Sequence, residues 1–334
     1  MIDHRCLIIA EAGVNHNGSI ETAKELCRAA KQAGADVVKF QTWITEKIIT
    51  HDVKQAAYQI ENTGNNQSQF DMLKTLELSF DQFREIKLYC DRIGIQFAST
   101  ADEPESLDFL IELGVPFIKI GSGDLNNIPF LRYCGSKKMP VILSTGMGTL
   151  SDTEAALNAL RKGGATDITL LHCTTSYPCP YDRVNLNAMN TLHTAFGVPV
   201  GYSDHTQGIE VSIAAVTLGA EVIEKHFTLD RNMEGPDHIA SMEPYEFKTM
   251  VDAIRNIEIA LGTGLKKPTD LENEISSVVQ KRIVANKPIL SGKILDEEDL
   301  CVKRSASGIL AGNWDLVVGT IARKNYDVDE GICF

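Results

Sequence analysis

Residues 198–206, VPVGYSDHT, and residues 222–230, VIEKHFTLD, share a feature that decides the fold. Each begins as an apolar strand and ends in groups that bind water, protons or metal ions. Side chains alternate along a strand, so Ser203 and His205 are expected on the same side. A buried strand gains stability from apolar side chains, and an unpaired buried charge is costly. The polar ends therefore indicate a functional site.

Short apolar runs of this kind alternate with amphipathic segments along the chain. The expected strands are 7–14, 36–42, 96–100, 117–122, 140–146, 168–174, 198–205 and 222–228. Strand–helix alternation with nearly continuous apolar strands predicts a parallel sheet, and eight such units predict a closed (β/α)8 barrel, the TIM barrel. An open doubly wound sheet is the alternative, but the first strand lacks the glycine-rich turn that this fold needs.

The sequence pattern changes after Gly262. Residues 263–282 are polar and linker-like, and residues 283–334 contain short strands separated by turns. A segment of about fifty residues is marginally stable alone and is expected to pack on something larger. We therefore predict a barrel domain over 1–262, a linker and a small C-terminal domain over 283–334.

Composition excludes several classes of partner. The chain has 334 residues and a formal net charge of −13, which disfavours nucleic acid and anionic membranes. Neither a secretory signal nor a sufficiently long apolar run is present, so no membrane segment is expected. The eight cysteines are scattered without a CxxC pair, which predicts reduced thiols and a cytoplasmic protein.

A barrel brings the carboxyl ends of all its strands to one rim, where barrel enzymes carry their active sites. A lone histidine or lysine at a strand end is weak evidence, because each has structural roles. The convergence of many such residues is the stronger signal. Those expected at the rim are Glu11, Lys39, Thr100, Lys119, Ser122, Ser144, Thr145, His205, Glu224 and His226.

Two kinds of chemistry are indicated at this rim. Lys39 and Lys119, with hydroxyls near the backbone amides of the GSG and STGM turns, suit a phosphate or a phosphorylated carboxylate. His205 and His226, on adjacent strands, can share a divalent ion that keeps open positions, which favours a manganese-type catalytic ion over closed structural zinc. The alternative is two histidines hydrogen-bonded to carboxylates.

Two carboxylates accompany these groups at the rim. Glu11 and Glu224 are expected close to the lysines and to the proposed ion. Carboxyl groups in such a position can move protons during a reaction. They are therefore the candidate proton-transfer groups.

Several motifs, in order, resemble the sialic acid synthase (N-acetylneuraminate synthase) family: EAGVNHNGS, VVKFQT, KIGSGDLNN, ILSTGM, LLHCTTSYP, GYSDHT, EKHFTLD and GPDHIAS. VKRSASG near the end resembles that family's antifreeze-like (SAF) domain. The resemblance implies condensation of phosphoenolpyruvate with the open-chain aldehyde of N-acetylmannosamine, giving N-acetylneuraminate and phosphate. It also implies a divalent ion, Mn²⁺ or Mg²⁺, held by the residues matching His205 and His226.

The resemblance further assigns substrate-binding residues. Those matching the phosphoenolpyruvate subsite are Lys39, Thr100, Lys119, Ser122, Ser144 and Ser203. Those matching the reacting centre and the sugar site are Glu11, Glu224, Gln41, Tyr177 and Asp237. Members of the family are head-to-tail homodimers, which implies that Arg304 binds the sugar in the partner's site.

This chain departs from the family pattern at three places. Ala101 and Asp102 stand where Pro-Phe is common, and Asp124, still expected to bind substrate, stands where Glu is usual. The loop after Arg304 is Ser-Ala-Ser-Gly in place of Pro-Gly-Asn-Gly.

The acceptor sugar stays open at this point. Residues 57–79 resemble both N-acetylneuraminate synthases and synthases of N,N'-diacetyllegionaminate, which use 2,4-diacetamido-2,4,6-trideoxymannose. Both sugars present the same aldehyde and 2-acetamido group and differ at C4 and C6. A metal-dependent pyruvate aldolase or lyase is an alternative of another class, and a sugar-binding protein without activity is a third.

Overall fold

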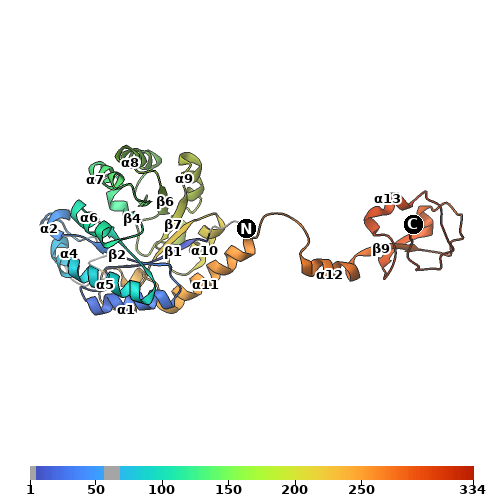
Figure 1. Ribbon diagram of the computed structural model, residues 1–334, viewed down its shortest axis with the longest axis horizontal. Helices are drawn as coiled ribbons and strands as arrows, with labels where there is room; N and C mark the ends of the chain where they lie inside the picture. Colours follow the sequence, from blue (N-terminus) through green and yellow to red (C-terminus); the bar gives the residue numbers. More distant parts are fainter. Residues whose placement is uncertain (1–4, 56–67) are drawn as a thin grey trace. The chain divides into compact units, whose positions relative to one another are not determined.

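The computed structural model describes residues 5–55 and 68–334, which divide into two compact units, Met1–Thr263 and Gly264–Phe334 (Figure 1). In the first unit, parallel strands close into a barrel in chain order. The strands are β1 (Leu7–Gly13), β2 (Val37–Thr42), β3 (Gln96–Ala101), β4 (Ile118–Ile120), β5 (Val141–Ser144), β6 (Ile168–Cys173), β7 (Val200–Asp204) and β8 (Val222–His226). The predicted (β/α)8 barrel is confirmed.

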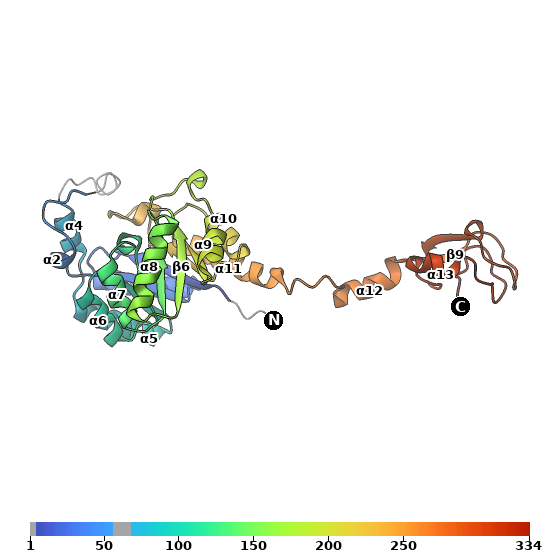
Figure 2. The same ribbon diagram turned by 90° about the horizontal axis from the view of Figure 1, so that it is seen from above.

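Helices surround the strands on the outside of the barrel (Figures 1 and 2). They are α1 (Ile20–Gln32), α5 (Phe80–Ile93), α6 (Pro104–Leu113), α7 (Ile128–Ser136), α8 (Leu150–Gly163), α9 (Ala188–Phe196), α10 (Glu210–Thr217) and α11 (Pro244–Leu261). Helix α1 begins where the Ser19 hydroxyl accepts a hydrogen bond from Thr22 N, and its C-cap is Ala33. Gly34 follows one position later with a φ of 86°.

An apolar layer fills the barrel interior below its mouth. It consists of Ile9, Val37, Ala98, Phe117, Ile142, Leu171 and Val222. Alternation along a strand brings every second residue to the same side. Two positions further along each strand stand Glu11, Lys39, Thr100, Lys119, Ser144, Cys173 and Glu224.

In strand β7, Gly201 occupies the position that corresponds to the apolar layer of the other strands. A Cβ on Gly201 would lie 2.4 Å from Val222 O and 2.7 Å from Leu171 Cδ2, so a side chain has no room there. Ser203 follows Gly201 by two residues and pairs in register with Glu224 of β8. The apolar layer therefore supports a polar layer directly above it.

The long connection after β2 contains two described helices, α2 (Thr45–Ile48) and α4 (Gln69–Leu76). Residues 57–67 of the segment that resembles both kinds of synthase lie outside the described residues. Helix α4 packs through Met72 and Leu76 against Val14 and Trp43, the residues that follow β1 and β2. It therefore lies over the carboxyl ends of those two strands.

The second unit has its own apolar core, formed around Ile283, Leu300 and Tyr326. Its elements are α12 (Asp270–Val279), β9 (Lys281–Ala285), β10 (Leu300–Arg304) and α13 (Trp314–Val317), with β9 and β10 antiparallel. No described helix of either unit has the length and apolar character needed to cross a membrane.

Candidate active site

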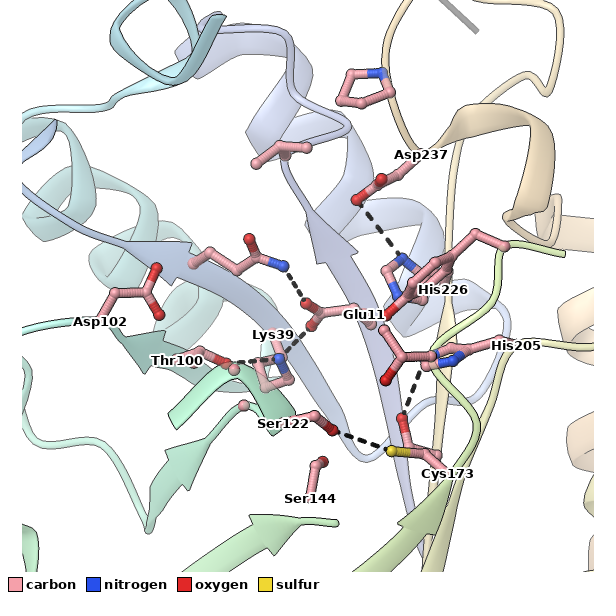
Figure 3. A pocket seen from close by; sticks show the side chains of 18 of the residues that line it. Glu11, Lys39, Thr100, Asp102, Ser122, Ser144, Cys173, His205, His226 and Asp237 are labelled. Carbon is pink, nitrogen blue, oxygen red and sulfur yellow. Dashed lines mark hydrogen bonds and ion pairs between the residues drawn. The ribbon is translucent and has the colours of Figure 1, made fainter. Parts of the chain in front are cut away.

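A cavity of about 470 Å³ opens at the carboxyl ends of the barrel strands (Figure 3). It brings together most of the residues predicted for the site. These are Glu11, Lys39, Gln41, Thr100, Lys119, Ser122, Ser144, Tyr177, Ser203, His205, Glu224, His226 and Asp237.

Three predicted residues are placed elsewhere. The Asp124 carboxylate accepts a hydrogen bond from Asn127 Nδ2 (2.8 Å) and is not part of the cavity wall. The Thr145 hydroxyl donates to Leu171 O (2.9 Å), within the barrel wall. Arg304 ends β10 in the second unit and is exposed.

Two buried lysines and two buried carboxylates form the floor of the cavity. Lys39 Nζ lies 2.6 Å from Glu11 Oε2 and donates to Thr100 Oγ1 (2.8 Å), as Figure 3 shows. Lys119 Nζ donates to Ser144 Oγ (2.8 Å) and lies 3.5 Å from Glu224 Oε1. Each lysine is only 2% exposed, so these partners are what keep both charges in the interior.

The two carboxylates differ in electrostatic environment. Burial alone would raise the pKa of Glu224, but Lys119 and Lys39 outweigh burial and lower that pKa to about 2. Burial raises the pKa of Glu11, although Lys39 opposes the shift. Glu224 is therefore an anion at neutral pH in the resting site, and Glu11 retains a proton more readily.

The turn after β5 positions the hydroxyl of Ser122. Gly146 N donates to Ser122 Oγ (3.0 Å), and Cys173 Sγ lies 3.1 Å from the same oxygen. A Cβ on Gly146 would lie 2.4 Å from Thr175 Oγ1 and 2.7 Å from Ser122 Oγ. Only glycine at this position leaves these hydroxyls in place.

The two predicted metal ligands are adjacent in the cavity. The His205 and His226 ring centroids are 5.4 Å apart. His205 Nδ1 donates to the carbonyl of Thr174 (2.7 Å), which fixes the tautomer and leaves the lone pair on Nε2. His226 Nδ1 is buried and has no hydrogen-bond partner among the described residues; Asp237 Oδ2 is 3.9 Å away.

Both imidazoles are suited to binding a cation. Burial, followed by His205, lowers the pKa of His226 to about 3, and burial also lowers the pKa of His205. A neutral imidazole is the form that ligates a metal. Among the described residues, no group of three or more His, Cys, Asp or Glu side chains forms a closed metal site. The chemistry that fits a metal here is thus limited to the pair of neutral imidazole nitrogens.

The segment that carries Asp237 is held by hydrogen bonds on both sides. Ser241 Oγ donates to Asp237 O (2.6 Å). His238 lies 2.7 Å from Thr228 Oγ1 through Nδ1 and 3.2 Å from Asn17 Oδ1 through Nε2. Burial, followed by Glu11, raises the pKa of Asp237 to about 7.

Several residues of the cavity wall were not predicted as site residues. Cys173 could have been found, because it follows the interior residue Leu171 by two positions. Asp102 was noted only as a departure from the family pattern, yet its side chain lines the cavity without a side-chain hydrogen bond to any described residue. Helix α4 and the residue after β1 add an apolar wall: Val14, Met72, Leu73 and Leu76.

The fold and this site define a barrel protein with a cavity for an anionic ligand beside a pair of neutral histidines. The sequence model of the NeuB family matches residues 26–266, and the chain belongs to that family. NeuB enzymes condense phosphoenolpyruvate with a sugar and form a carbon–carbon bond, so the predicted enzyme class is confirmed.

Relatives and solved structures agree with this assignment. N,N'-diacetyllegionaminic acid synthase of Campylobacter jejuni is 49% identical over 328 residues, 98% of each chain. The enzyme of the same name from Legionella pneumophila is 46% identical and covers 96% of this chain and 91% of its own. The crystal structure of N-acetylneuraminic acid synthetase from Leptospira borgpetersenii, in complex with citrate, has a TM-score of 0.71 and 35% identity. It covers 81% of this chain and 90% of that one.

Proposed function

We propose that this enzyme is an N,N'-diacetyllegionaminate synthase. It condenses phosphoenolpyruvate with 2,4-diacetamido-2,4,6-trideoxymannose and releases phosphate. The observation that carries the proposal is the 49% identity, over nearly the whole of both chains, to an enzyme of that name. The sequence analysis gave N-acetylneuraminate as the main expected product and N,N'-diacetyllegionaminate as the alternative. The relatives favour N,N'-diacetyllegionaminate. N-acetylneuraminate stays the competing product, supported by the 35% identical synthetase structure.

The floor of the cavity is suited to phosphoenolpyruvate. Lys39 and Lys119 supply the positive charge that its phosphate and carboxylate require, and Ser122, Ser144 and Thr100 add hydroxyl donors. These groups hold the enol with its C3 facing the acceptor, an arrangement that lowers the entropic cost of bringing two substrates together.

His205 and His226 would hold the divalent ion, Mn²⁺ or Mg²⁺. When bound, the ion supplies Lewis-acid polarisation of the acceptor's carbonyl group. Tyr177 packs against both rings, with ring centroids 4.2 Å from His205 and 5.4 Å from His226. Tyr177 therefore restricts the two rings from the open side of the cavity.

The reaction moves protons at the aldehyde oxygen and at the attacking water, and two carboxylates stand at its centre. Phosphoenolpyruvate C3 forms the new bond to the aldehyde carbon, whose oxygen gains a proton. Water adds at C2 and loses a proton; the bond between C2 and the phosphate oxygen then breaks, and the new hydroxyl becomes the keto group as its proton passes to the leaving phosphate. Glu11, held by Lys39 Nζ and Gln41 Nε2 (3.0 Å), and Glu224, held by Ser203 Oγ (3.2 Å), are the groups placed to exchange these protons.

The remaining parts of the proposal concern assembly and location. The resemblance of the second unit to a SAF domain supports a head-to-tail homodimer in which Arg304 of a partner subunit contacts the sugar. All eight cysteines are free thiols, which supports a cytoplasmic enzyme.

A substrate panel tests the function. The purified enzyme with Mn²⁺ is given phosphoenolpyruvate and either the 2,4-diacetamido sugar or N-acetylmannosamine, and phosphate and product mass are measured. We expect phosphate only when both substrates are present, and a higher kcat/KM for the 2,4-diacetamido sugar.

Each rival gives a different result in that panel. A higher kcat/KM for N-acetylmannosamine would identify an N-acetylneuraminate synthase. Product formation from pyruvate without phosphate release would identify an aldolase or lyase. Binding of the sugar without any product would leave a sugar-binding protein.

A further inference from the structure

One side of the polar cavity is mainly apolar, although Gln69 at the start of α4 also lines it. The apolar residues that line this side are Val14, Met72, Leu73 and Leu76. Val14, Met72 and Leu76 are almost fully buried. The floor and the opposite side carry lysines, carboxylates, hydroxyls and histidines. An apolar surface contributes nothing to binding phosphate, carboxylate or a divalent ion, so its role in the site concerns another part of the ligand.

This apolar wall is anchored firmly. Thr45 N donates to Glu77 Oε2 (2.9 Å) just beyond α4, and Trp43 Nε1 donates to Thr45 Oγ1 (3.0 Å). A Cβ on Gly18 would lie 2.8 Å from Thr75 O, so the backbone of the β1 loop packs directly against α4. The wall therefore has a fixed distance from the floor of the cavity.

The wall lies across the mouth from three of the proposed phosphoenolpyruvate groups, whereas Lys39 comes from β2 beneath it. It stands over β1 and β2, whereas Lys119, Ser122 and Ser144 come from β4, β5 and the turn between them. In a barrel closed in chain order, β1 and β2 face β5 and β6. An acceptor whose aldehyde meets phosphoenolpyruvate above Glu11 and Glu224 extends its far end toward the wall.

We infer that the wall of Val14, Met72, Leu73 and Leu76 recognises the C6 methyl group of a 6-deoxy acceptor and so sets the specificity of the enzyme at C6. This inference rests on the proposed function and names the part of the site that selects the sugar. A methyl group buries apolar surface on the wall. A C6 hydroxyl loses its hydrogen bonds to water there and gains none from these four side chains.

The expected discrimination is moderate. An apolar pocket rejects a ligand that only adds a hydroxyl by about 100-fold at most. We therefore expect wild-type kcat/KM to be about 10- to 100-fold higher for a 6-deoxy acceptor than for its 6-hydroxy counterpart.

The experiment compares two acceptors that differ only at C6: 2-acetamido-2,6-dideoxymannose and N-acetylmannosamine. Because both have a C4 hydroxyl, the comparison is independent of whether the 2,4-diacetamido sugar is the natural substrate. Leu73→Gln places an amide on the wall and should lower the kcat/KM ratio by about tenfold or more, mainly by improving use of the 6-hydroxy acceptor. Leu73→Met keeps the wall apolar and should keep the ratio.

Further variants separate recognition from folding. Leu88→Gln makes the same substitution at an exposed position of α5, outside the cavity, and should leave the ratio unchanged. Val14→Thr, which keeps the shape of the side chain, gives a second test if Leu73→Gln does not fold. Equal kcat/KM for both acceptors in the wild type would overturn the inference. So would a kcat/KM ratio that neither Leu73→Gln nor Val14→Thr changes, and the wall would then serve only in packing.

Discussion

Each polar residue at the floor of this site follows, two positions later in the same strand, a residue of the apolar layer inside the barrel. Lys39 stands above Val37, Lys119 above Phe117 and Glu224 above Val222 in their strands. The apolar layer excludes water from below, so each charge depends on its neighbours for compensation. Mutual pairing of lysines and carboxylates is thus a condition of folding as well as of ligand binding.

Removing either proposed metal ligand should abolish metal-dependent turnover. His226→Ala or His205→Ala is expected to lower kcat with Mn²⁺ by at least about 100-fold, because Lewis-acid polarisation contributes several kcal/mol. The measurement is phosphate release at saturating substrate, with circular dichroism to confirm the fold. His193→Ala, at an exposed position of α9, is the control. Unchanged turnover in both cavity variants would refute the metal assignment.

Asp102 should make stability depend on pH. Burial, followed by the nearby Asp124 carboxylate, raises the pKa of Asp102 from 3.8 to about 7. Between these two pH values the folded state holds a proton that the unfolded state releases. The contribution of Asp102 to the free energy of unfolding is therefore complete below pH 3.8 and is lost as the pH rises to about 7. Asp102→Asn should flatten this dependence, measured as urea midpoints between these pH values. A variant that parallels the wild type throughout would exclude Asp102 as the cause.

At the scale of elements, the outer faces of β7 and β8 carry a further buried ion pair, apart from those in the cavity floor. Lys225 Nζ donates to Asp204 Oδ2 (2.8 Å), which also accepts from Ser212 Oγ of α10 (2.6 Å). This pair lies on the opposite side of the strands from His205 and Glu224, because side chains alternate. It ties the two strand ends that carry the proposed metal ligands to each other and to a helix.

Breaking this pair should be costly. Lys225→Met leaves the Asp204 carboxylate buried without its cation and is expected to lower the free energy of unfolding by about 3–5 kcal/mol. Denaturant titration measures the change. Lys248→Met, which breaks an exposed pair with Asp252 on α11, is the matched control and should cost about 1 kcal/mol or less. Equal losses in both variants would contradict the structural role of the buried pair.

On the scale of the whole molecule, the chain folds as two units with separate apolar cores. The barrel core and the cavity belong entirely to the first unit. Arg304 belongs to the second, and the proposal that it contacts the sugar in a partner's cavity depends on the family resemblance.

Arg304→Ala tests that proposal. Loss of a hydrogen bond from a charged group should lower kcat/KM for the sugar by about 10- to 100-fold, and the affinity for Mn²⁺ should not change. Lys303→Ala is the control, because Lys303 is engaged by Asp329 within its own unit. Identical sugar kinetics in Arg304→Ala and the wild type would remove Arg304 from the site.

The barrel and most of the residues that line the cavity could be predicted from the amino-acid sequence. Both follow from local periodicity: strand–helix alternation specifies the closed parallel sheet, and a spacing of two places Lys39, Lys119 and Glu224 on its interior side. Once the strands are known to end at one rim, their terminal side chains must meet there.

The hydrogen-bond partners of individual side chains, and the residues that face them across the cavity, became known only from the folded structure. Asp124 accepts a hydrogen bond from Asn127 in its own loop, and Thr145 donates one to Leu171 of the neighbouring strand β6, so neither side chain is part of the cavity wall. The apolar wall could not be inferred from periodicity, since α4 reaches the mouth through contacts with residues far away in the sequence, Val14 and Trp43. Contacts of this kind depend on chain closure and packing, which no local pattern encodes.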